Sequence, residues 1–354
     1  MDEADTKDGP SAGGPLRERL LAACRLRFHG FAVATMIALA AAFLSEHYGA
    51  PAMLLAILIG LALHFLSEDE RSLPGLDFAA RTMLRFGIAC LGLRVSLGMF
   101  VDLGPVMLIL IAVAVAGTIA FGILVARFAG QDARFGMLTG GAVAICGASA
   151  AMAIAAVIAR PDKTEAEREM GFVVIGVTML STLSMIFYPV IATALGLPER
   201  EIGMFLGATI HDVAQVAGAG FSVSVPAGET AVFVKLIRVT MLAPVVLAAV
   251  LMFRQSAPAG TRRPPLLPGF VIVFILLAAI NSVVTVPPIV SDLAGQVSRW
   301  ALLVAIAAVG VKTSLASISK VGGRAISALV ADTVFLAVFV LVAMLLLGPE
   351  RIGV

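Results

Sequence analysis

Two glycine-rich stretches, residues 136–150 and 203–220, hold most of the groups that could bind a polar ligand, and each interrupts a hydrophobic segment. In hydrocarbon every backbone N–H and C=O must be paired internally, so irregular backbone survives only where it lines a cavity or packs against protein. A matched pair of interrupted segments is typical of a carrier's binding site near the middle of the bilayer. The residues that we predict to line this site are Cys146, Gly147, Ala148, Ser149, Thr209, His211, Asp212 and Gln215.

Embedded basic residues indicate the charge of the ligand. Lys235 and Arg238 lie one helical turn apart inside a hydrophobic segment, and Arg94 and Lys312 lie toward the ends of two others. A charged residue at membrane depth costs roughly 2.5–3.5 kcal/mol on insertion scales, so each needs a reason. Embedded bases outnumber embedded acids, and interrupted helices offer N-termini that bind anions, so we expect an anionic ligand. Neutral donors around it would be Ser96, Thr139, Ser149, Thr209, Gln215 and Ser314.

His211 and Asp212 are the residues best suited to binding a proton. A histidine titrates near neutral pH, and an adjacent carboxylate can shift its titration. The pair could instead satisfy unwound backbone, and the sequence leaves both roles open. Hydroxyl groups often serve helix packing, and Arg94 and Lys312 also complement helix dipoles. Asp332 is either an ion-coupling carboxylate or a polar residue at a helix contact.

The composition excludes a soluble globular protein. Hydrophobic residues make up 60% of the 354 positions and charged residues 14%, with a mean hydropathy of +1.03, which leaves too little polar surface to cover a globule. The three cysteines are isolated and the four histidines show no metal-ligand spacing, so we expect no metal and no cofactor. No ATP-binding glycine loop is present, and the net charge of +2 gives no indication of nucleic-acid binding.

The hydrophobic pattern predicts an all-α polytopic membrane protein with about eleven membrane-embedded elements, taking about 20 apolar residues as one span. Residues 1–28 form a cytoplasmic polar tail and residues 29–350 the transmembrane domain. By the positive-inside rule the N-terminus is cytoplasmic, the C-terminus periplasmic, and the loops near 46–50, 101–104, 221–229 and 287–296, which lack Lys and Arg, lie outside. The elements are expected near residues 30–46, 51–66, 83–100, 105–126, 136–159, 171–195, 203–224, 230–253, 268–286, 297–317 and 324–347.

One loop bears on the two interrupted elements. If both elements cross fully, the loop at residues 160–169 lies outside with Arg160, Lys163 and Arg168, against the charge rule. If both instead enter and return, or cross as unwound helices, that loop can lie on the cytoplasmic side. We expect two discontinuous elements, and the sequence does not choose between crossing helices and re-entrant hairpins.

Two internal repeats accompany this pattern. Gly136 and Met137 recur as Gly203 and Met204 at an offset of 67, and further small residues keep register. Residues 92–97 recur as residues 310–315 at an offset of 218, with the basic residue, the serine and the leucine in register. The second pair lies an odd number of elements apart, so its copies face opposite sides, as in the inverted repeats of alternating-access carriers.

Four motifs resemble the YeiH-type family of bacterial inner-membrane proteins, which are named as sulfate exporters. The resemblance extends from about residue 30 to the C-terminus. It implies a relation to cation/proton antiporters and bile-acid symporters, with a scaffold domain and a moving core domain that bears two unwound helices. The implied substrate is sulfate or a related oxyanion such as sulfite, moved outward. The motifs are Ala-Ile-Cys-Gly-Ala-Ser-Ala at 144–150, Leu-Gly-Ala-Thr-Ile-His-Asp-Val-Ala-Gln-Val at 206–216, Lys-Leu-Ile-Arg-Val-Thr-Met-Leu-Ala-Pro at 235–244 and Gly-Val-Lys-Thr-Ser-Leu at 310–315.

The function that we expect is secondary transport of a small anion, with export of sulfate or a related sulfur oxyanion (sulfite, sulfonate) by alternating access across the bacterial inner membrane. The partners are then the small inorganic anion and the lipid bilayer, with no nucleic acid, and a homodimer stays open. The alternatives are a cation-coupled organic-anion carrier and a cation/proton antiporter. An intramembrane enzyme using His211 and Asp212 is a remote alternative, because the sequence has no activated nucleophile signature.

Overall fold

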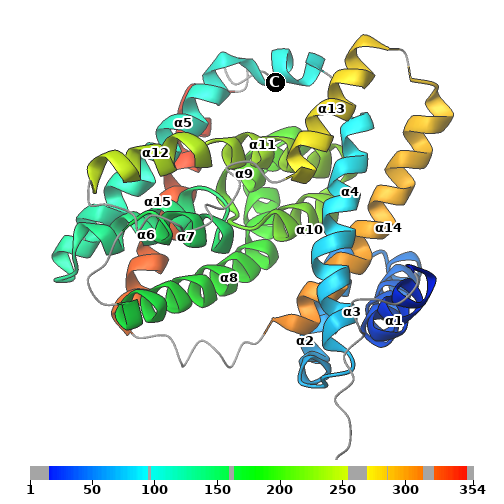
Figure 1. Cartoon of the computed structure of the whole chain (residues 1–354). Helices are drawn as coiled ribbons and strands as arrows, with labels where there is room; N and C mark the ends of the chain where they lie inside the picture. The colour runs from blue at the N-terminus through cyan, green and yellow to red at the C-terminus, as the bar shows by residue number, and fades with distance from the viewer. Residues whose placement is uncertain are drawn as a thin grey trace, which may run out of the picture.

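Helices and short connections account for all of the chain that the computed structural model describes, which is residues 16–94, 97–158, 163–253, 269–284, 286–313 and 323–348 (Figure 1). The expected all-α class is therefore confirmed for these ranges. The helices are α1 (Leu16–Tyr48), α2 (Ala52–Ala62), η1 (His64–Ser67), α3 (Leu73–Asp77), η2 (Phe78–Met83), α4 (Leu84–Leu91), η3 (Gly92–Arg94), α5 (Leu97–Phe128), α6 (Ala133–Ala144), α7 (Ala148–Ala155), α8 (Lys163–Ala194), α9 (Glu199–Thr209), α10 (Val213–Val223), α11 (Val225–Thr240), α12 (Leu242–Met252), α13 (Gly269–Val283), α14 (Pro288–Lys312) and α15 (Gly323–Leu347).

Six stretches of described helix are long and apolar enough to cross a bilayer. They lie in α1, α5, α8, α11 with α12, α14 and α15, and their outward faces carry many large hydrophobic side chains. This agrees with a multi-pass membrane protein. The six stretches are Arg25–Tyr48, Leu103–Phe128, Arg168–Ala194, Val225–Met252, Pro288–Lys312 and Ile326–Leu347.

Some expected boundaries differ from the structure. The expected outside loop at residues 101–104 coincides with a break in α5 at Gly104 (φ 71°, ψ 158°), where two helical stretches meet at a kink before Pro105. Glycine reaches this left-handed conformation without a steric penalty, and the proline ring fixes the next turn. The expected outside loop at 287–296 is mostly helical, because α14 begins at Pro288. Helix α1 already begins at Leu16, within the range assigned to a polar tail.

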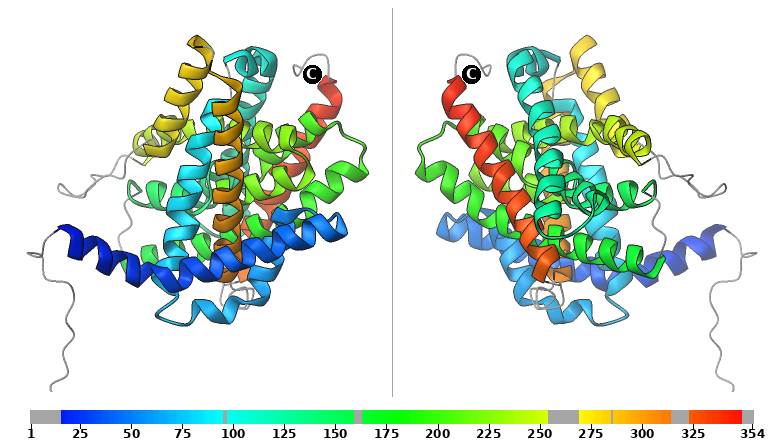
Figure 2. Two further views of the ribbon diagram at one scale, coloured as in Figure 1. Left: turned by 90° about the vertical axis from the view of Figure 1, so that its right-hand side faces the viewer. Right: turned by 90° about the vertical axis from the view of Figure 1, so that its left-hand side faces the viewer.

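The helices form two groups. The first, called here the α14 group, contains α1 to α4, α13 and α14, on the right of Figure 1. The second, called the hairpin group, contains α5 to α12 and α15, on the left. In Figure 2, α1 runs across the upright α14, and α10 packs against both α2 and α14. Helix α10 is thus one of the places where the two groups meet.

Two helix pairs run in opposite directions. Helix α4 ascends beside the descending α14, and α5 descends beside the ascending α15 (Figure 1). The Ser298 hydroxyl of α14 donates to the Gly87 carbonyl of α4 at 2.7 Å, while Arg94 at the other end of this pair lies against Gly295. These contacts fix α4 and α14 as an antiparallel pair.

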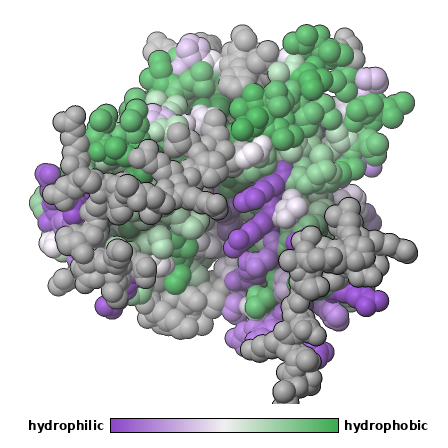
Figure 3. Space-filling view, viewed as in Figure 1, coloured by the Kyte–Doolittle hydropathy of each residue, from purple (hydrophilic) through white to green (hydrophobic). Residues whose placement is uncertain are grey.

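Hydrophobic side chains dominate the upper part of the face in Figure 3, including the region of α13 and α14. Hydrophilic side chains gather below, in the middle and lower part of the same face. Arg71, Arg81 and Arg85, which lie before and within the α3–α4 segment, are exposed. One end of this helix group is therefore polar and basic.

Glycine permits a close contact between α2 and α14 in the α14 group. A Cβ atom on Gly60 of α2 would lie 2.6 Å from the Ala307 carbonyl oxygen, and one on Gly310 of α14 would lie 2.7 Å from the Ile57 carbonyl oxygen. Small residues at such a crossing let the two backbones approach, which is how helices associate where lipid removes the hydrophobic driving force.

We predict that Gly60→Ala lowers the melting temperature of the detergent-solubilised protein, because the new methyl group pushes two backbones apart at a cost of about 1–3 kcal/mol. The matched control is Gly171→Ala in α8, where no atom lies within 4 Å of the added Cβ. The control should melt at or above the wild-type temperature, since alanine favours a helix. Equal melting temperatures for the two variants would contradict this packing.

Candidate functional site

The first interrupted segment forms a helical hairpin. Helix α6 begins at the N-cap Asp132, whose Oδ1 accepts from the Phe135 amide at 2.9 Å. After α6 ends, Gly147 (φ 64°, ψ −126°) turns the chain, and its amide donates to the Ala142 carbonyl at 2.8 Å. Helix α7 then doubles back, because a Cβ on Gly141 would lie 2.3 Å from the Ile154 side chain.

The second interrupted segment forms a similar hairpin. At its base the Ser224 hydroxyl, just after α10, donates to Glu199 Oε2 at the start of α9 at 2.9 Å. Gly203 of α9 and Gly220 of α10 both lie against Ala227 of α11, since added Cβ atoms would be 2.6 and 3.1 Å from its carbonyl oxygen. The two arms of the hairpin therefore share one supporting helix, α11.

The tips of the two hairpins lie against each other. A Cβ on Gly147 would lie 3.6 Å from the Cβ of His211. Each tip is a short non-helical stretch, residues 145–147 between α6 and α7 and residues 210–212 between α9 and α10. The sequence left open whether each element crosses or returns, and in the structure both helix pairs return.

Lys235 of α11 is hydrogen-bonded to both tips. Its side chain is fully buried, at 0% exposure. The Nζ atom donates to the Ile145 carbonyl of the first tip and, at 2.8 Å, to the Ile210 carbonyl of the second. One ammonium group thus neutralises carbonyl oxygens at the C-terminal ends of α6 and α9, where the helix dipole is negative.

Arg238, one turn further along α11, makes the same connection with five hydrogen bonds. It is 1% exposed. Because a guanidinium presents its donors in a fixed planar fork, it can serve carbonyls on both hairpins at once. Nε and Nη2 donate to Ala144 at 3.0 and 2.7 Å, Nη2 donates to Val143 at 3.0 Å, and Nη1 donates to Gly207 and Ile210 at 3.1 and 3.0 Å.

Both basic side chains therefore hold protein backbone. We expected Lys235 and Arg238 to face the ligand, and the structure directs their donors to the carbonyl groups that the helix breaks leave unpaired. The physical reason is that the last carbonyls of a helix have no intrahelical partner, and a buried cation satisfies several of them together. Their positive charge still lies next to the two tips.

Asp212 caps the N-terminus of α10. Its Oδ1 accepts from the Ala214 amide at 2.8 Å, and its own amide donates to the Ser181 hydroxyl of α8 at 3.0 Å. Gln215 lies in the same network, with Oε1 accepting from Ser181 and Nε2 donating to Thr182, both at 3.4 Å. The sequence did not indicate Ser181 and Thr182 as site residues, because they lie within the continuous helix α8 and not in a glycine-rich break.

His211 connects the second tip to α15. Its Nε2 lies 3.0 Å from the Thr333 hydroxyl, which itself donates to the Leu329 carbonyl at 2.7 Å. The direction of the bond between the two side chains depends on the tautomer of the histidine. His211 is fully buried. Thr333 also escaped sequence reasoning, because a single threonine in an apolar helix gives no signal of its partner.

The N-terminus of α7 differs from that of α10. No side chain caps it, and Gly147 occupies the N-cap position. Ala148 is half-buried and Ser149 is exposed. The Ser149 hydroxyl donates back to the carbonyl oxygen and Sγ of Cys146 at 3.1 and 3.0 Å. An uncapped helix N-terminus with free N–H groups is suited to an anion.

The remaining expected residues lie elsewhere. Arg94 pairs with Glu229, with Nε and Oε1 2.6 Å apart, and Lys312 forms an ion pair with Asp77. The hydroxyls of Thr139 and Thr209 donate to carbonyls of their own helices, at 3.3 and 2.6 Å. Ser96 and Ser314 lie outside the described residues.

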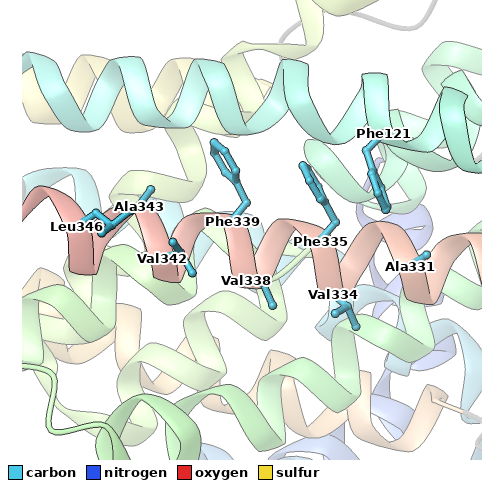
Figure 4. A pocket seen from close by; sticks show the side chains of 9 residues that line it. All are labelled: Phe121, Ala331, Val334, Phe335, Val338, Phe339, Val342, Ala343 and Leu346. Carbon is cyan, nitrogen blue, oxygen red and sulfur yellow. The ribbon is translucent and has the colours of Figure 1, made fainter.

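The described residues offer no group of three or more His, Cys, Asp or Glu side chains that could hold a metal ion. A groove of about 630 Å³ between α5 and α15 is lined by apolar and aromatic side chains alone (Figure 4). It has no polar group to orient a charged ligand, so this groove is not suited to binding an anion. The residues lining the groove are Phe121, Ala331, Val334, Phe335, Val338, Phe339, Val342, Ala343 and Leu346.

Comparison with known proteins places the chain in a family. The model of the family described as conserved hypothetical protein 698 matches residues 29–329. The chain belongs to this family, the UPF0324 membrane proteins. The family assignment made from the four motifs is thereby confirmed. No solved structure matches the chain.

Several curated relatives match over nearly their whole length. The UPF0324 membrane protein TauZ of Paracoccus denitrificans is 58% identical over 325 residues, which cover 91% of this chain and 96% of the relative. A UPF0324 membrane protein of Rhizobium meliloti (strain 1021) is 53% identical, covering 90% and 93%. One of Chlorobaculum tepidum is 50% identical, covering 89% and 88%. The hairpin segments lie within the range matched by the family model.

We predict that Arg238→Lys destabilises the protein although it keeps the charge, because a compact ammonium cannot reach the carbonyls of both hairpins at once. Leaving buried carbonyls unpaired costs about 1–3 kcal/mol each, so the melting temperature in detergent should fall clearly. The matched control is Arg94→Lys, whose partly exposed ion pair contributes about 0–1 kcal/mol. An Arg238→Lys protein as stable as this control would show that the guanidinium geometry is unimportant.

Proposed function

We propose that this membrane protein is a secondary transporter of a small anion, and that the anion is sulfate, sulfite or a sulfonate moved across the bacterial inner membrane by alternating access. The observation that carries the proposal is the uncapped N-terminus of α7 at the meeting point of two hairpin tips. The choice of sulfur oxyanions rests on the resemblance of the motifs to the sulfate exporter family.

The charge around the tips favours an anion at α7. Lys235 and Arg238 bring two positive charges beneath the tips, and Asp212 brings one negative charge that already occupies the N-terminus of α10. The end of α7 is left with a positive helix dipole and free N–H groups. These are the donors that bind a tetrahedral oxyanion.

Alternating access requires two parts that move relative to each other, and we propose the α14 group and the hairpin group for these roles. An inverted repeat that relates the α3–α4 segment to α14, both within the α14 group, is supported by paired contacts. Arg94 lies against Gly295, and Lys312 pairs with Asp77. An offset of 218 converts Arg94 into Lys312 and Asp77 into Gly295, so it exchanges one contact for the other.

A contact near the expected pseudo-two-fold axis gives further support. Phe335 lies 218 positions after Gly117, and a Cβ on Gly117 would be 3.9 Å from the Phe335 ring. Residues related by a two-fold axis meet each other only close to that axis. The opposite directions of α4 and α14, and of α5 and α15, agree with an axis in the membrane plane (Figure 1).

The orientation that we propose has the N-terminus in the cytoplasm and the C-terminus in the periplasm. Exposed Arg71, Arg81 and Arg85 lie before or within the α3–α4 segment. Helix α3 lies toward the lower end of the molecule in Figure 1. The positive-inside rule assigns such a cluster to the cytoplasmic side. Helix α15 ends at the opposite, upper side.

The test of this function is uptake of radiolabelled anion into proteoliposomes. Sulfate, sulfite and methanesulfonate would each be measured against chloride and acetate, with and without a pH gradient. The proposal expects saturable flux of at least one sulfur oxyanion above protein-free liposomes. Flux of an organic carboxylate driven by a cation gradient would favour the cation-coupled organic-anion carrier, and cation exchange for protons without anion flux would favour an antiporter.

We predict that Ser149→Asp abolishes binding of the sulfur oxyanion while the protein stays folded. A carboxylate in the first turn of α7 stabilises the helix and occupies the place of the ligand. The matched control is Ser149→Asn, which has nearly the same size and no charge, and should bind within about tenfold of wild type, as expected for one neutral hydrogen bond. Isothermal titration with sulfate and sulfite measures both. Unchanged affinity in Ser149→Asp would move the site away from α7.

A further inference from the structure

Asp332 of α15 is a buried acid with no role in the site described above. Its side chain is 0% exposed, and neither carboxyl oxygen has a hydrogen-bond partner among the described residues. An isolated ionised carboxylate in an apolar interior is far more costly than the neutral acid. The surroundings of Asp332 therefore accommodate a proton on this carboxyl group in the conformation described here.

The neighbours of Asp332 are small or neutral. Helix α15 packs against α5, α6, α8 and α9. A Cβ on Gly122 of α5 would lie 3.0 Å from Asp332 Oδ2, and the Thr139 hydroxyl of α6 is close enough to interact with the carboxyl. No charged side chain from these four helices acts on it among the described residues.

Two successive residues of α15 contact the two hairpins separately. Asp332 lies against α6, which is the first arm of the first hairpin. Thr333 is hydrogen-bonded to His211, a titratable side chain at the tip of the second hairpin. A change of charge at Asp332 therefore acts on the same helix that positions the second tip.

Asp332 has no acidic counterpart in the internal repeat. At the offset of 218, the counterpart of Asp332 is Ala114 of α5, which is also buried. If position 332 served only to pack helices together, an alanine like its counterpart Ala114 would be sufficient there. The acid is thus an addition to one copy of the repeat.

We propose that Asp332 binds the proton that couples the movement of the hairpins to a pH gradient. This inference rests on the proposed transport function and names its coupling ion. The Thr139 hydroxyl supplies the link. It now donates to the Gly136 carbonyl of α6 at 3.3 Å, and a neutral Asp332 can donate to its oxygen. When the proton leaves, the Thr139 hydroxyl must turn to donate to the carboxylate, which releases the carbonyl of α6.

The experiment compares wild type, Asp332→Asn and the control Asp292→Asn, an exposed acid on α14, in matched proteoliposomes. Flux of the transported oxyanion is measured without a gradient, with a pH gradient of either direction, and with a sodium gradient. Asp332→Asn should lose the whole of the response to the pH gradient and keep exchange of labelled for unlabelled anion. Asp292→Asn should respond as wild type does. A pH response that survives in Asp332→Asn overturns the proposal, as does a response to sodium in place of protons.

A second measurement does not depend on transport. Infrared difference spectra of the purified protein between acid and alkaline buffer should contain the C=O band of a protonated carboxyl in a dry environment, and Asp332→Asn should lack it while Asp292→Asn keeps it. Because asparagine resembles the neutral acid in size and charge, Asp332→Asn should melt no lower than wild type at neutral pH. If the wild-type protein transports no anion but Asp332→Asn lacks the band, the proposed transport function fails and the proton site stands. A band unchanged in Asp332→Asn overturns the proton site itself.

Discussion

The binding of Lys235 and Arg238 to the ends of two helices is the interaction on which the rest of the structure depends. Helices α6 and α9 both end at the same place, and their last carbonyl groups point toward one buried region. Such negative helix ends repel each other where water is excluded. The two cations of α11 convert this repulsion into attraction, because each donates to carbonyls of both hairpins.

The polarity of the ligand site follows from the same interaction. Four helix ends meet at the tips, and three of them are already neutralised. The two C-terminal ends are held by the cations, and Asp212 serves the N-terminal end of α10. Only the N-terminal end of α7 remains without a capping side chain. A ligand that completes this arrangement has to carry negative charge, and its affinity depends on how well the cations behind the tips remain shielded from water.

The sequence predicted the helical class, because hydrophobic length is a local signal, and clustered glycine indicated where two segments would be interrupted. The function of each glycine was not predictable. Gly147 turns the chain with a positive φ, whereas Gly203 and Gly220 permit contact with α11. A glycine marks the end of a helix or a close contact equally well, so the choice between a crossing helix and a hairpin needed the partner helix. That partner contains no interruption.

Long-range partners were also beyond the sequence. An embedded cation such as Arg238 must be satisfied, but a backbone carbonyl and a bound anion satisfy it equally, and the sequence contains nothing that separates the two. His211 and Thr333 are 122 positions apart, and each alone is compatible with ordinary helix packing. The relation of Arg94 to Lys312 by the repeat stays a prediction, and their acidic partners Glu229 and Asp77 follow no motif.

The position of these cations in the chain constrains the order in which the protein is assembled. The first tip exposes the carbonyls of Val143, Ala144 and Ile145, and the groups that bind them are encoded 90 to 95 residues later. During synthesis the first hairpin therefore emerges long before its partner helix exists. Its tip must stay hydrated, or remain within the insertion machinery, until α11 enters the membrane. The carbonyls of residues 143–145 thus find their partners only late in synthesis, when α11 is present. A truncated chain that ends before α11 lacks these partners for its first hairpin.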